Sequence, residues 1–523
     1  MKVMVRTMTE NKRGTAVKIL PWAVLAVYSV MTFLGALNHE MWLDEAQAWV
    51  ILRDAPLSEL PRIFHIEGHP PLWYAVLYPF VKLGFPAEYA PLISWLPMAA
   101  GAAVLLFKVK LPQPLKYVML ASSGFLYYNS VMLRVYSLIP LLLFLILWIY
   151  PRRREHGILY GLLIALLANT HIFICGIVGM LGIFMLADLF SQWKDSSPKE
   201  NAGKLAGLVI AGAGVLMLVI PMIGSAEANG AVGSSLSLSP RAIFLAATTT
   251  FNDVFMQILQ PRFGGAAWFV ILMTATLMLW CMIILLRHWK RALAVEIGFI
   301  VFYYLTCGLF WITIPNRAVL FILSFAFSLG IAQYEKPAFK EREVSGKITS
   351  NALKKLLALL LKADRNAERV YVMILAVFFA VSVPAGVSML YRDITGNFSS
   401  AKATAEYISE NFEEDAVFVV LRCGLPELSV YDPNIDLYAA GSGEFCTYAK
   451  WEYMYRPPRT ADEVIEELSQ YEHLYVIHYK DQIPDSDDIL YVGEGMTGFD
   501  IKNSLVIREY SDDLIENYLF FGF

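Results

Sequence analysis

Long apolar runs separated by short polar turns make up the first three quarters of the chain. The first run covers residues 19–37 and is long enough to cross about 30 Å of hydrocarbon. Basic residues collect in alternate turns, most densely at residues 152–154. Because Lys and Arg are enriched in the cytosolic loops of membrane proteins, this pattern predicts about eleven transmembrane helices, a cytoplasmic N-terminus and a C-terminal segment on the opposite, exoplasmic side.

The composition supports a multi-pass protein of the plasma membrane. Of 523 residues, 57% are hydrophobic and 17% charged, and the mean hydropathy is +0.51. A soluble protein could not bury so much apolar surface. The net charge of -4 and an acidic tail are the opposite of what a nucleic-acid binder shows. Membrane lipids are expected partners, and the basic segment 335–369 is expected to lie on anionic lipid at the cytosolic face.

Two outer loops interrupt the pattern of spans. The first covers residues 38–88, and its segment 70–84 is apolar but short, broken by Pro79 and rich in Trp and Tyr. These features favour a helix in the membrane interface over a span. The second loop covers residues 223–262, where a Gly/Ser-rich stretch, 224–239, is expected to act as a lid and 240–259 as an amphipathic helix.

The tail, residues 392–523, has the composition of a water-soluble domain. Helical patterns at 401–412 and from Thr460 alternate with apolar strand patterns at 416–421, 474–478 and 504–507. Cys423 and Cys446 lie in this tail, and the sequence leaves open whether they pair. The predicted fold class is therefore mainly α, a polytopic membrane bundle over residues 1–391 followed by a small exoplasmic α/β domain.

Polar residues that could take part in a reaction gather in the predicted outer loops. The spans themselves carry almost no ionisable side chains, whereas ion-coupled transporters keep a charge near the middle of the membrane. The pattern thus favours chemistry on a membrane-held substrate at the outer rim. The candidates are Asp44, Glu45, His69, Arg134, Tyr136, His171 and Arg317.

Four motifs resemble the bacterial branch of the GT-C glycosyltransferases, which includes protein O-mannosyltransferases and aminoarabinose transferases. They are Trp42-Leu43-Asp44-Glu45-Ala46, His69-Pro70-Pro71-Leu72-Trp73-Tyr74, Arg134-Val135-Tyr136-Ser137 and Thr170-His171-Ile172-Phe173. The resemblance implies that Asp44 and Glu45 form the acidic pair of the catalytic loop. It also implies a polyprenyl-phosphate-linked sugar as donor, an envelope glycan, lipid or protein as acceptor, and a reaction on the outer side of the membrane.

The chemistry of such a donor agrees with these residues. A sugar on a lipid phosphate already has a good leaving group, so the reaction needs a base for the acceptor hydroxyl and a cation for the phosphate. Asp44 fits the first role and Arg134 the second, with inversion at the anomeric carbon. Neighbouring helical side chains point about 100° apart, so Glu45 is expected to orient the loop, assist a metal or bind acceptor. A position at a helix N-terminus would stabilise the Asp44 charge, which favours a positioning role.

Structural interpretations of the same residues stay open. Asp44 and Glu45 could cap a helix, His69 could belong to a turn, Arg134 could snorkel to the interface, and His171 could be a hydrogen-bonded rim residue. The other interpretation is that four of these residues bind the donor phosphate or the substrate, namely Tyr136, His69, His171 and Arg317. No cofactor is predicted, although Asp44, Glu45 and His69 could hold a divalent cation. Rival functions are a lipid-linked glycan flippase and a non-catalytic envelope scaffold, with the tail guiding acceptor or binding wall polymer.

Overall fold

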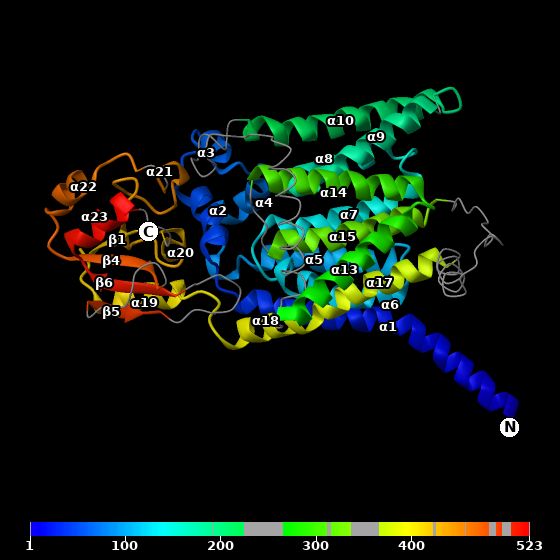
Figure 1. Ribbon diagram of the computed structural model, residues 1–523, viewed down its shortest axis with the longest axis horizontal. Helices are drawn as coiled ribbons and strands as arrows, with labels where there is room; N and C mark the ends of the chain where they lie inside the picture. Colours follow the sequence, from blue (N-terminus) through cyan, green and yellow to red (C-terminus); the bar gives the residue numbers. More distant parts are fainter. Residues whose placement is uncertain are drawn as a thin grey trace.

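A bundle of helices with a small mixed domain at one end forms the molecule (Figure 1). The computed structural model describes residues 2–191, 193–223, 265–310, 315–335, 366–421, 425–454, 457–480, 488–493 and 504–521. The N-terminus lies at the end of the bundle that faces away from the C-terminal domain (Figure 1). The predicted class, a polytopic helical bundle with a small C-terminal α/β domain, is confirmed.

Seven described segments are helical, long and apolar enough to cross a membrane, and two shorter apolar helices accompany them. The apolar segment 115–131 is not one continuous helix, because α6 (Gln113–Ala121) ends at Ala121 and a π-helical turn, Gly124–Tyr128, follows. The total of eleven stays a prediction. The bundle helices are α1 (Lys2–Asn38), α5 (Leu92–Phe107), α6 (Gln113–Ala121), α7 (Leu138–Ile149), α8 (Gly157–Ala168), α9 (Cys175–Ser191), α10 (Pro198–Met222), α13 (Gly265–Leu286), α14 (Lys290–Phe310), α15 (Pro315–Ala332), α17 (Ala367–Val381) and α18 (Val383–Thr395).

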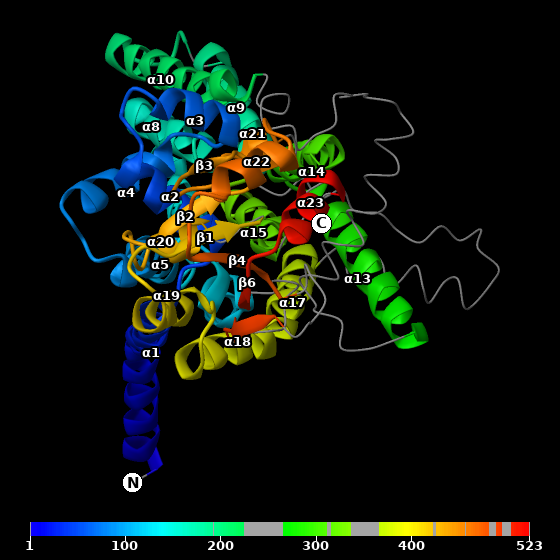
Figure 2. The same ribbon diagram turned by 90° about the vertical axis from the view of Figure 1, so that its left-hand side faces the viewer.

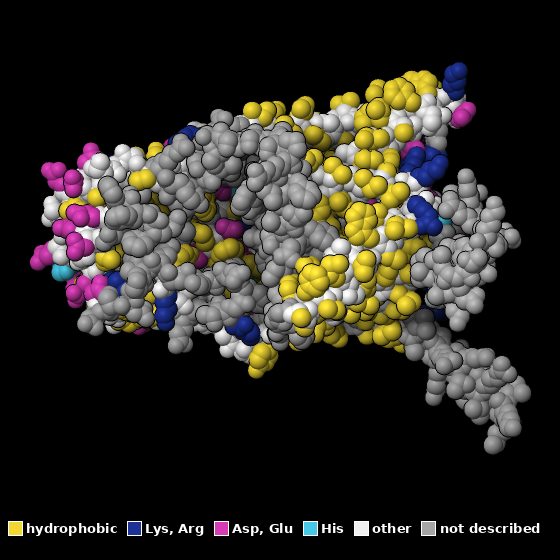
Figure 3. All heavy atoms as spheres, in the orientation of Figure 1, with side chains coloured by type: hydrophobic (Ala, Val, Ile, Leu, Met, Phe, Trp, Pro, Cys, Tyr) yellow, Lys and Arg dark blue, Asp and Glu magenta, His cyan; other side chains and the backbone are white. Residues whose placement is uncertain are grey.

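The surface of the bundle divides by charge along its length. Hydrophobic side chains cover its flank, and Asp and Glu gather on the C-terminal domain (Figure 3). Lys and Arg lie at the end far from that domain, and a few also lie nearer to it (Figure 3). An ion-pair cluster joins α9 to the basic turn after α7 and to the first turn of α14, because Asp188 contacts Arg153 at 2.8 Å and Arg291 at 2.7 Å. This separation of charge is the one that the predicted orientation requires.

Three short helices of the first predicted outer loop lie between the bundle and the C-terminal domain (Figures 1 and 2). They are α2 (Leu43–Asp54), α3 (Leu60–Glu67) and α4 (Leu72–Lys82). With 11 residues, α4 is too short to cross a membrane, as expected for the segment 70–84. Trp49, Ile51 and Leu77 of these helices form an apolar core with Val430 of the C-terminal domain. The loop is therefore fixed between two bodies.

A six-stranded sheet in the order β3-β2-β1-β4-β6-β5 organises the C-terminal domain. Strands β2, β1 and β4 are parallel, and the others are antiparallel to their neighbours. The predicted strands correspond to β1 (Val417–Val420), β4 (Leu474–Tyr479) and β6 (Leu505–Glu509), whereas β2 (Asp436–Ala439), β3 (Glu444–Phe445) and β5 (Ile489–Val492) were not predicted. The helices are α19 (Ala401–Asn411), α20 (Leu425–Ser429), α21 (Trp451–Met454), α22 (Ala461–Leu468) and α23 (Asp512–Phe521).

Several predictions concern residues outside the described ranges. They are the lid 224–239, the amphipathic helix 240–259, most of the basic segment 335–369, and Cys423. Cys446 is described and is a free thiol. The helix α18 ends at Thr395, a few residues beyond the predicted domain boundary.

Candidate functional site

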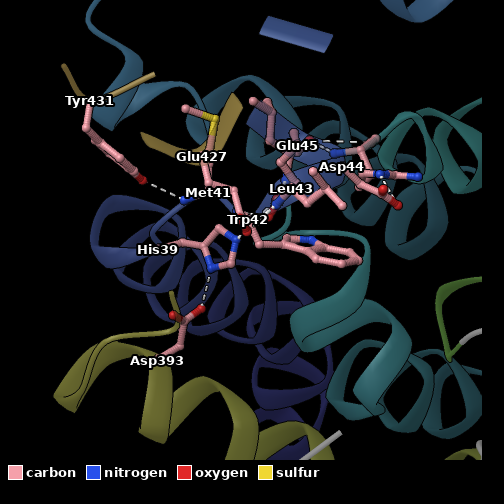
Figure 4. Close-up of polar contacts among 12 residues, drawn as sticks. His39, Met41, Trp42, Leu43, Asp44, Glu45, Asp393, Glu427 and Tyr431 are labelled. Atoms are coloured by element: carbon pink, nitrogen blue, oxygen red, sulfur yellow. Dashed lines mark hydrogen bonds and ion pairs between the residues drawn. The ribbon is translucent and has the colours of Figure 1, made fainter. Parts of the chain in front are cut away.

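The first turn of α2 carries both acidic residues of the predicted catalytic loop. The helix begins after Trp42, whose backbone is extended and whose side chain has no oxygen to cap the helix. Asp44 and Glu45 are the second and third residues of the helix, after Leu43, and point in different directions (Figure 4). Glu45 is fully buried, whereas the Asp44 side chain is 28% exposed. The adjacent carboxylates therefore face different surroundings.

Asp44 forms an ion pair with Arg134. Arg134 Nη1 lies 2.7 Å from Asp44 Oδ2, and the arginine side chain is 10% exposed. Burial lowers the pKa of the guanidinium, but the charges of Asp44, Tyr136 and Glu45 and the hydrogen bond to Asp44 together raise it above its usual value. The Ser94 hydroxyl of α5 accepts a hydrogen bond from Arg134 N at 3.2 Å. Helix α5 thus fixes the backbone that presents the guanidinium to Asp44.

A cavity of about 110 Å³ opens beside this ion pair. Three residues singled out in the sequence meet on its wall, namely Asp44, His69 and Arg134. Apolar and aromatic side chains supply much of the remaining wall. The other lining residues are Gln47, Ala48, Ile66, Glu67, Pro70, Trp73, Tyr74, Val135, Thr170 and Trp451.

Tyr136 and His171 lie behind Arg134 and do not line the cavity that the described residues form. Their ring centroids are 5.1 Å apart, and the Arg134 guanidinium lies 6.0 Å from the Tyr136 ring. His171 Nδ1 accepts a hydrogen bond from Phe173 N at 3.2 Å, so the residue behaves as the hydrogen-bonded rim histidine that one interpretation expected. Arg317 lies in the first turn of α15, and its side chain is outside the described residues.

Glu45 holds together three segments around the site. Its carboxylate accepts hydrogen bonds from Leu133 N, next to Arg134, and from Trp42 N at 3.2 Å. It also lies 3.0 Å from His39 Nε2, and His39 Nδ1 lies 2.8 Å from Asp393 of α18. Burial lowers the pKa of His39, but these two carboxylates raise it well above its usual value. A protonated His39 between two carboxylates thus ties α2 to α18.

The suggested cation site of Asp44, Glu45 and His69 is wrong in its ligand set. Glu45 faces His39 rather than the cavity, so the three side chains do not converge. Within the described ranges, no group of three or more His, Cys, Asp or Glu side chains could hold a metal ion.

A buried carboxylate that sequence reasoning missed, Glu67, lines the same cavity. It accepts hydrogen bonds from Gln47 and Tyr74, both at 2.8 Å, and from Trp451 Nε1 at 3.1 Å. Burial raises the pKa of Glu67, and the hydrogen bonds moderate that rise. His69 Nδ1 lies 3.8 Å away. The sequence did offer one signal for Glu67: it stands two residues before His69, in the same loop.

The C-terminal domain supplies contacts that the sequence did not indicate. Glu427 accepts a hydrogen bond from Leu43 N at 2.7 Å, and Tyr431 Oη accepts one from Met41 N at 2.7 Å (Figure 4). Trp451 forms part of the cavity wall. Leu43 and Glu427 are 384 positions apart, and no local pattern reports such a pairing.

Comparison with known proteins identifies the fold. No protein-family model and no curated protein matches the chain. Among solved structures, ArnT from Cupriavidus metallidurans in the apo state matches with a TM-score of 0.50 and 12% identity, over 94% of this chain and 98% of that one. The structure of ArnT from the same organism bound to undecaprenyl phosphate gives 0.47 and 13%, over 95% and 99%. The chain has the polytopic membrane fold of ArnT, and the resemblance seen in the motifs is confirmed at the level of the fold.

Proposed function

We propose that this protein is a membrane glycosyltransferase that moves a sugar from a polyprenyl-phosphate-linked donor to an envelope acceptor on the outer side of the membrane. The observation that carries the proposal is the Asp44–Arg134 pair on the wall of a cavity enclosed by the bundle, the first loop and the C-terminal domain. The fold shared with ArnT extends over nearly the whole chain and agrees with the family whose motifs this sequence resembles.

Arg134 is the group proposed to hold the donor phosphate. A guanidinium offers five N–H donors in a planar fork that matches phosphate oxygens, and the contact to Asp44 uses one nitrogen. Because the arginine is largely buried, its attraction to a phosphate is screened less than at an open surface. As the bond to the sugar breaks, the leaving phosphate gains negative charge, which Arg134 stabilises.

Asp44 is the group proposed to receive the acceptor hydroxyl. Its partial exposure lets a hydroxyl reach it from the cavity. The ion pair with Arg134 and the helix N-terminus both stabilise the charge of Asp44, so orienting the hydroxyl is its main task. The hydroxyl proton passes to Asp44 as the acceptor oxygen bonds to the anomeric carbon and the bond from that carbon to the phosphate breaks. Attack from the face opposite the phosphate inverts the anomeric carbon.

The other predicted site residues have supporting roles in this proposal. Glu45 orients the loop by binding Leu133 N and His39. Tyr136 and His171 support Arg134 from behind. His69 lines the cavity, and contact with the substrate is its proposed role. Arg317 remains a prediction for donor binding.

Replacing Asp44 tests the proposal. Asp44→Asn keeps the shape of the side chain but removes the charge, so we expect sugar transfer to fall at least about 100-fold, the range over which positioned acid–base groups contribute. Binding of the donor lipid should change by less than about threefold, since Arg134 remains. The assay follows labelled sugar from the polyprenyl-phosphate donor pool into the acceptor fraction of membranes.

The matched control is Asp54→Asn at the other end of the same helix. Asp54 is ion-paired with Arg53 and does not line the cavity, so its substitution should leave transfer close to that of the wild type. Wild-type transfer by Asp44→Asn would remove Asp44 from the mechanism. An absence of transfer by the wild-type protein with every polyprenyl-linked sugar in the pool would refute the proposed function.

A further inference from the structure

The N-terminus of α2 is held by side chains that belong to the C-terminal domain. The first N–H groups of a helix have no partner within the helix and need one from elsewhere. Trp42 cannot provide it, because an indole has no acceptor oxygen. Leu43 N donates instead to Glu427 Oε1 at 2.7 Å, and Met41 N, just before the helix, donates to Tyr431 Oη at 2.7 Å.

Glu427 is a buried carboxylate in a rigid setting. The residue is 1% exposed, and every residue of its short helix, α20, is buried. Its second oxygen accepts a hydrogen bond from Tyr479 Oη of β4, so the sheet fixes the side chain. Burial raises the pKa of Glu427 to about 7, and the charges of Asp44 and Glu45 add to that rise. Burying the Glu427 carboxylate near Asp44 and Glu45 costs free energy, because the charge is desolvated and repelled by two like charges. The hydrogen bonds from Leu43 N and Tyr479 Oη offset part of that cost.

The contact lies one residue before the proposed acceptor-binding carboxylate. Fixing Leu43 N fixes the first turn of α2, and the first turn determines where Asp44 points. From the other side, Glu45 binds Leu133 N, next to Arg134. The relative position of Asp44 and Arg134 is thus set by two buried carboxylates, Glu45 and, from the C-terminal domain, Glu427.

Further along α2, other contacts dock the helix to the same domain without touching its N-terminus. The Gln47 side chain accepts from Ala449 N at 2.9 Å and donates to Ala449 O at 2.8 Å. The Thr447 hydroxyl donates to Asp54 at 2.5 Å. The domain therefore stays docked when the Glu427 contact alone is removed, which makes the role of that contact separable.

We propose that Glu427 is a positioning residue for sugar transfer, through which the C-terminal domain sets the orientation of Asp44 in the cavity. The inference rests on the proposed function. It gives the domain a definite part in the reaction, because the acceptor-binding carboxylate is correctly placed only while Glu427 accepts the hydrogen bond of Leu43 N.

Three variants of the full-length protein test the proposal. Glu427→Leu keeps the approximate volume and loses the acceptor, and we expect kcat to fall about 100-fold, the loss that a misplacement of about 1 Å can cause, while KM for the donor changes less than threefold. Glu427→Gln keeps a carbonyl oxygen for Leu43 N and should retain more than a third of kcat. Thr447→Val removes a contact between the domain and the far end of α2 and should transfer sugar like the wild type.

Hydrogen exchange measured on the same preparations reports on α2 without reference to activity. Faster exchange at residues 43–46 in Glu427→Leu, and wild-type exchange there in Glu427→Gln, would support the proposal. Unchanged kcat in Glu427→Leu would overturn it, as would equal losses in the Leu and Gln variants. If the wild-type protein transfers no sugar, the proposed function fails, and the exchange data alone then decide whether Glu427 orders the start of α2.

Discussion

Two neighbouring carboxylates at the start of α2 have separate surroundings because the helix turns by about 100° per residue. Asp44 faces Arg134 and the cavity, while Glu45 is buried against His39 and Leu133 N. In this motif, Asp44 is placed to contact a ligand in the cavity, whereas Glu45 holds the loop in position. A substitution at Glu45 leaves a protonated histidine and a backbone N–H without their partner, so it acts on folding before it acts on catalysis.

Removing the guanidinium of Arg134 should weaken binding of the donor. Hydrogen bonds to charged groups contribute about 1.5–3 kcal/mol, so we expect Arg134→Ala to bind a polyprenyl-phosphate sugar roughly 10- to 100-fold less tightly. Arg134→Lys keeps the charge but loses the planar fork of N–H donors. Its donor affinity should therefore lie between those of the wild type and Arg134→Ala. Equilibrium binding of labelled donor to purified protein measures both.

The matched control for this prediction is Arg62→Ala. Arg62 is 60% exposed and pairs with Glu452 at 3.0 Å, away from the Asp44–Arg134 pair. Its loss should leave donor affinity unchanged. Equal donor affinity in Arg134→Ala and the wild type would show that the phosphate binds elsewhere.

The sequence singled out Asp44, His69 and Arg134, which meet on one cavity wall, because spans without ionisable groups leave few candidates. Their roles in sugar transfer stay predictions. It could not identify Glu427 or Trp451, since their contacts with α2 and α3 join positions hundreds of residues apart. Glu67 lies in the same loop as His69, but one of its hydrogen bonds comes from Trp451 of the C-terminal domain, and the sequence does not indicate that contact.

Small residues determine how closely two helices of the bundle approach. A Cβ atom on Gly161 of α8 would lie 2.0 Å from Gly207 O of α10, and one on Gly214 would lie 2.5 Å from the Ala165 Cβ atom. Close backbone approach of this kind is a main source of attraction between helices in a membrane. The hydropathy of these segments predicted spans but not which faces meet, because a uniformly apolar helix carries no stripe to orient it.

A larger side chain at Gly161 should separate α8 from α10. We expect Gly161→Val to destabilise the protein by about 1–3 kcal/mol or more through overpacking, seen as a lower Tm in detergent. Gly212→Val, on the same α10 where an added Cβ meets nothing within 4 Å, is the control and should leave Tm nearly unchanged. Similar Tm values for both variants would contradict the observed packing.

The strands show a similar limit. Strands β1, β4 and β6 were predicted from their apolar runs, whereas β2, β3 and β5 were missed. Length alone does not separate the two sets, because β1, β2 and β5 have 4 residues each. Every position of β1 is apolar and buried, whereas β2 begins at the exposed Asp436, β5 has no buried position, and β3, with 2 residues, is too short to show a periodicity. Pairing with neighbouring strands makes them part of the sheet.

At the scale of the whole molecule, basic and acidic side chains lie at opposite ends of the apolar bundle (Figure 3). The proposed orientation places the C-terminal domain, with the cavity beneath it, outside the cell, where lipid-linked sugars meet envelope acceptors. The prediction of this orientation rests on the charge in the turns, which is the sum of many residues and does not depend on any one contact.

Single cysteines in a cysteine-free background test the orientation. Glu414 of the C-terminal domain and Glu155 of the basic turn are both exposed. We expect Glu414→Cys to react with a membrane-impermeant maleimide in intact cells and Glu155→Cys to react only after permeabilisation. The reverse pattern would place the site on the cytosolic side.

The most direct test of the central claim measures release of polyprenyl phosphate by purified protein given a polyprenyl-phosphate sugar and the acceptor fraction. The account predicts one polyprenyl phosphate released for each sugar transferred by the wild-type protein and by Asp54→Asn, and almost none by Asp44→Asn. Equal release by Asp44→Asn and the wild type would contradict it.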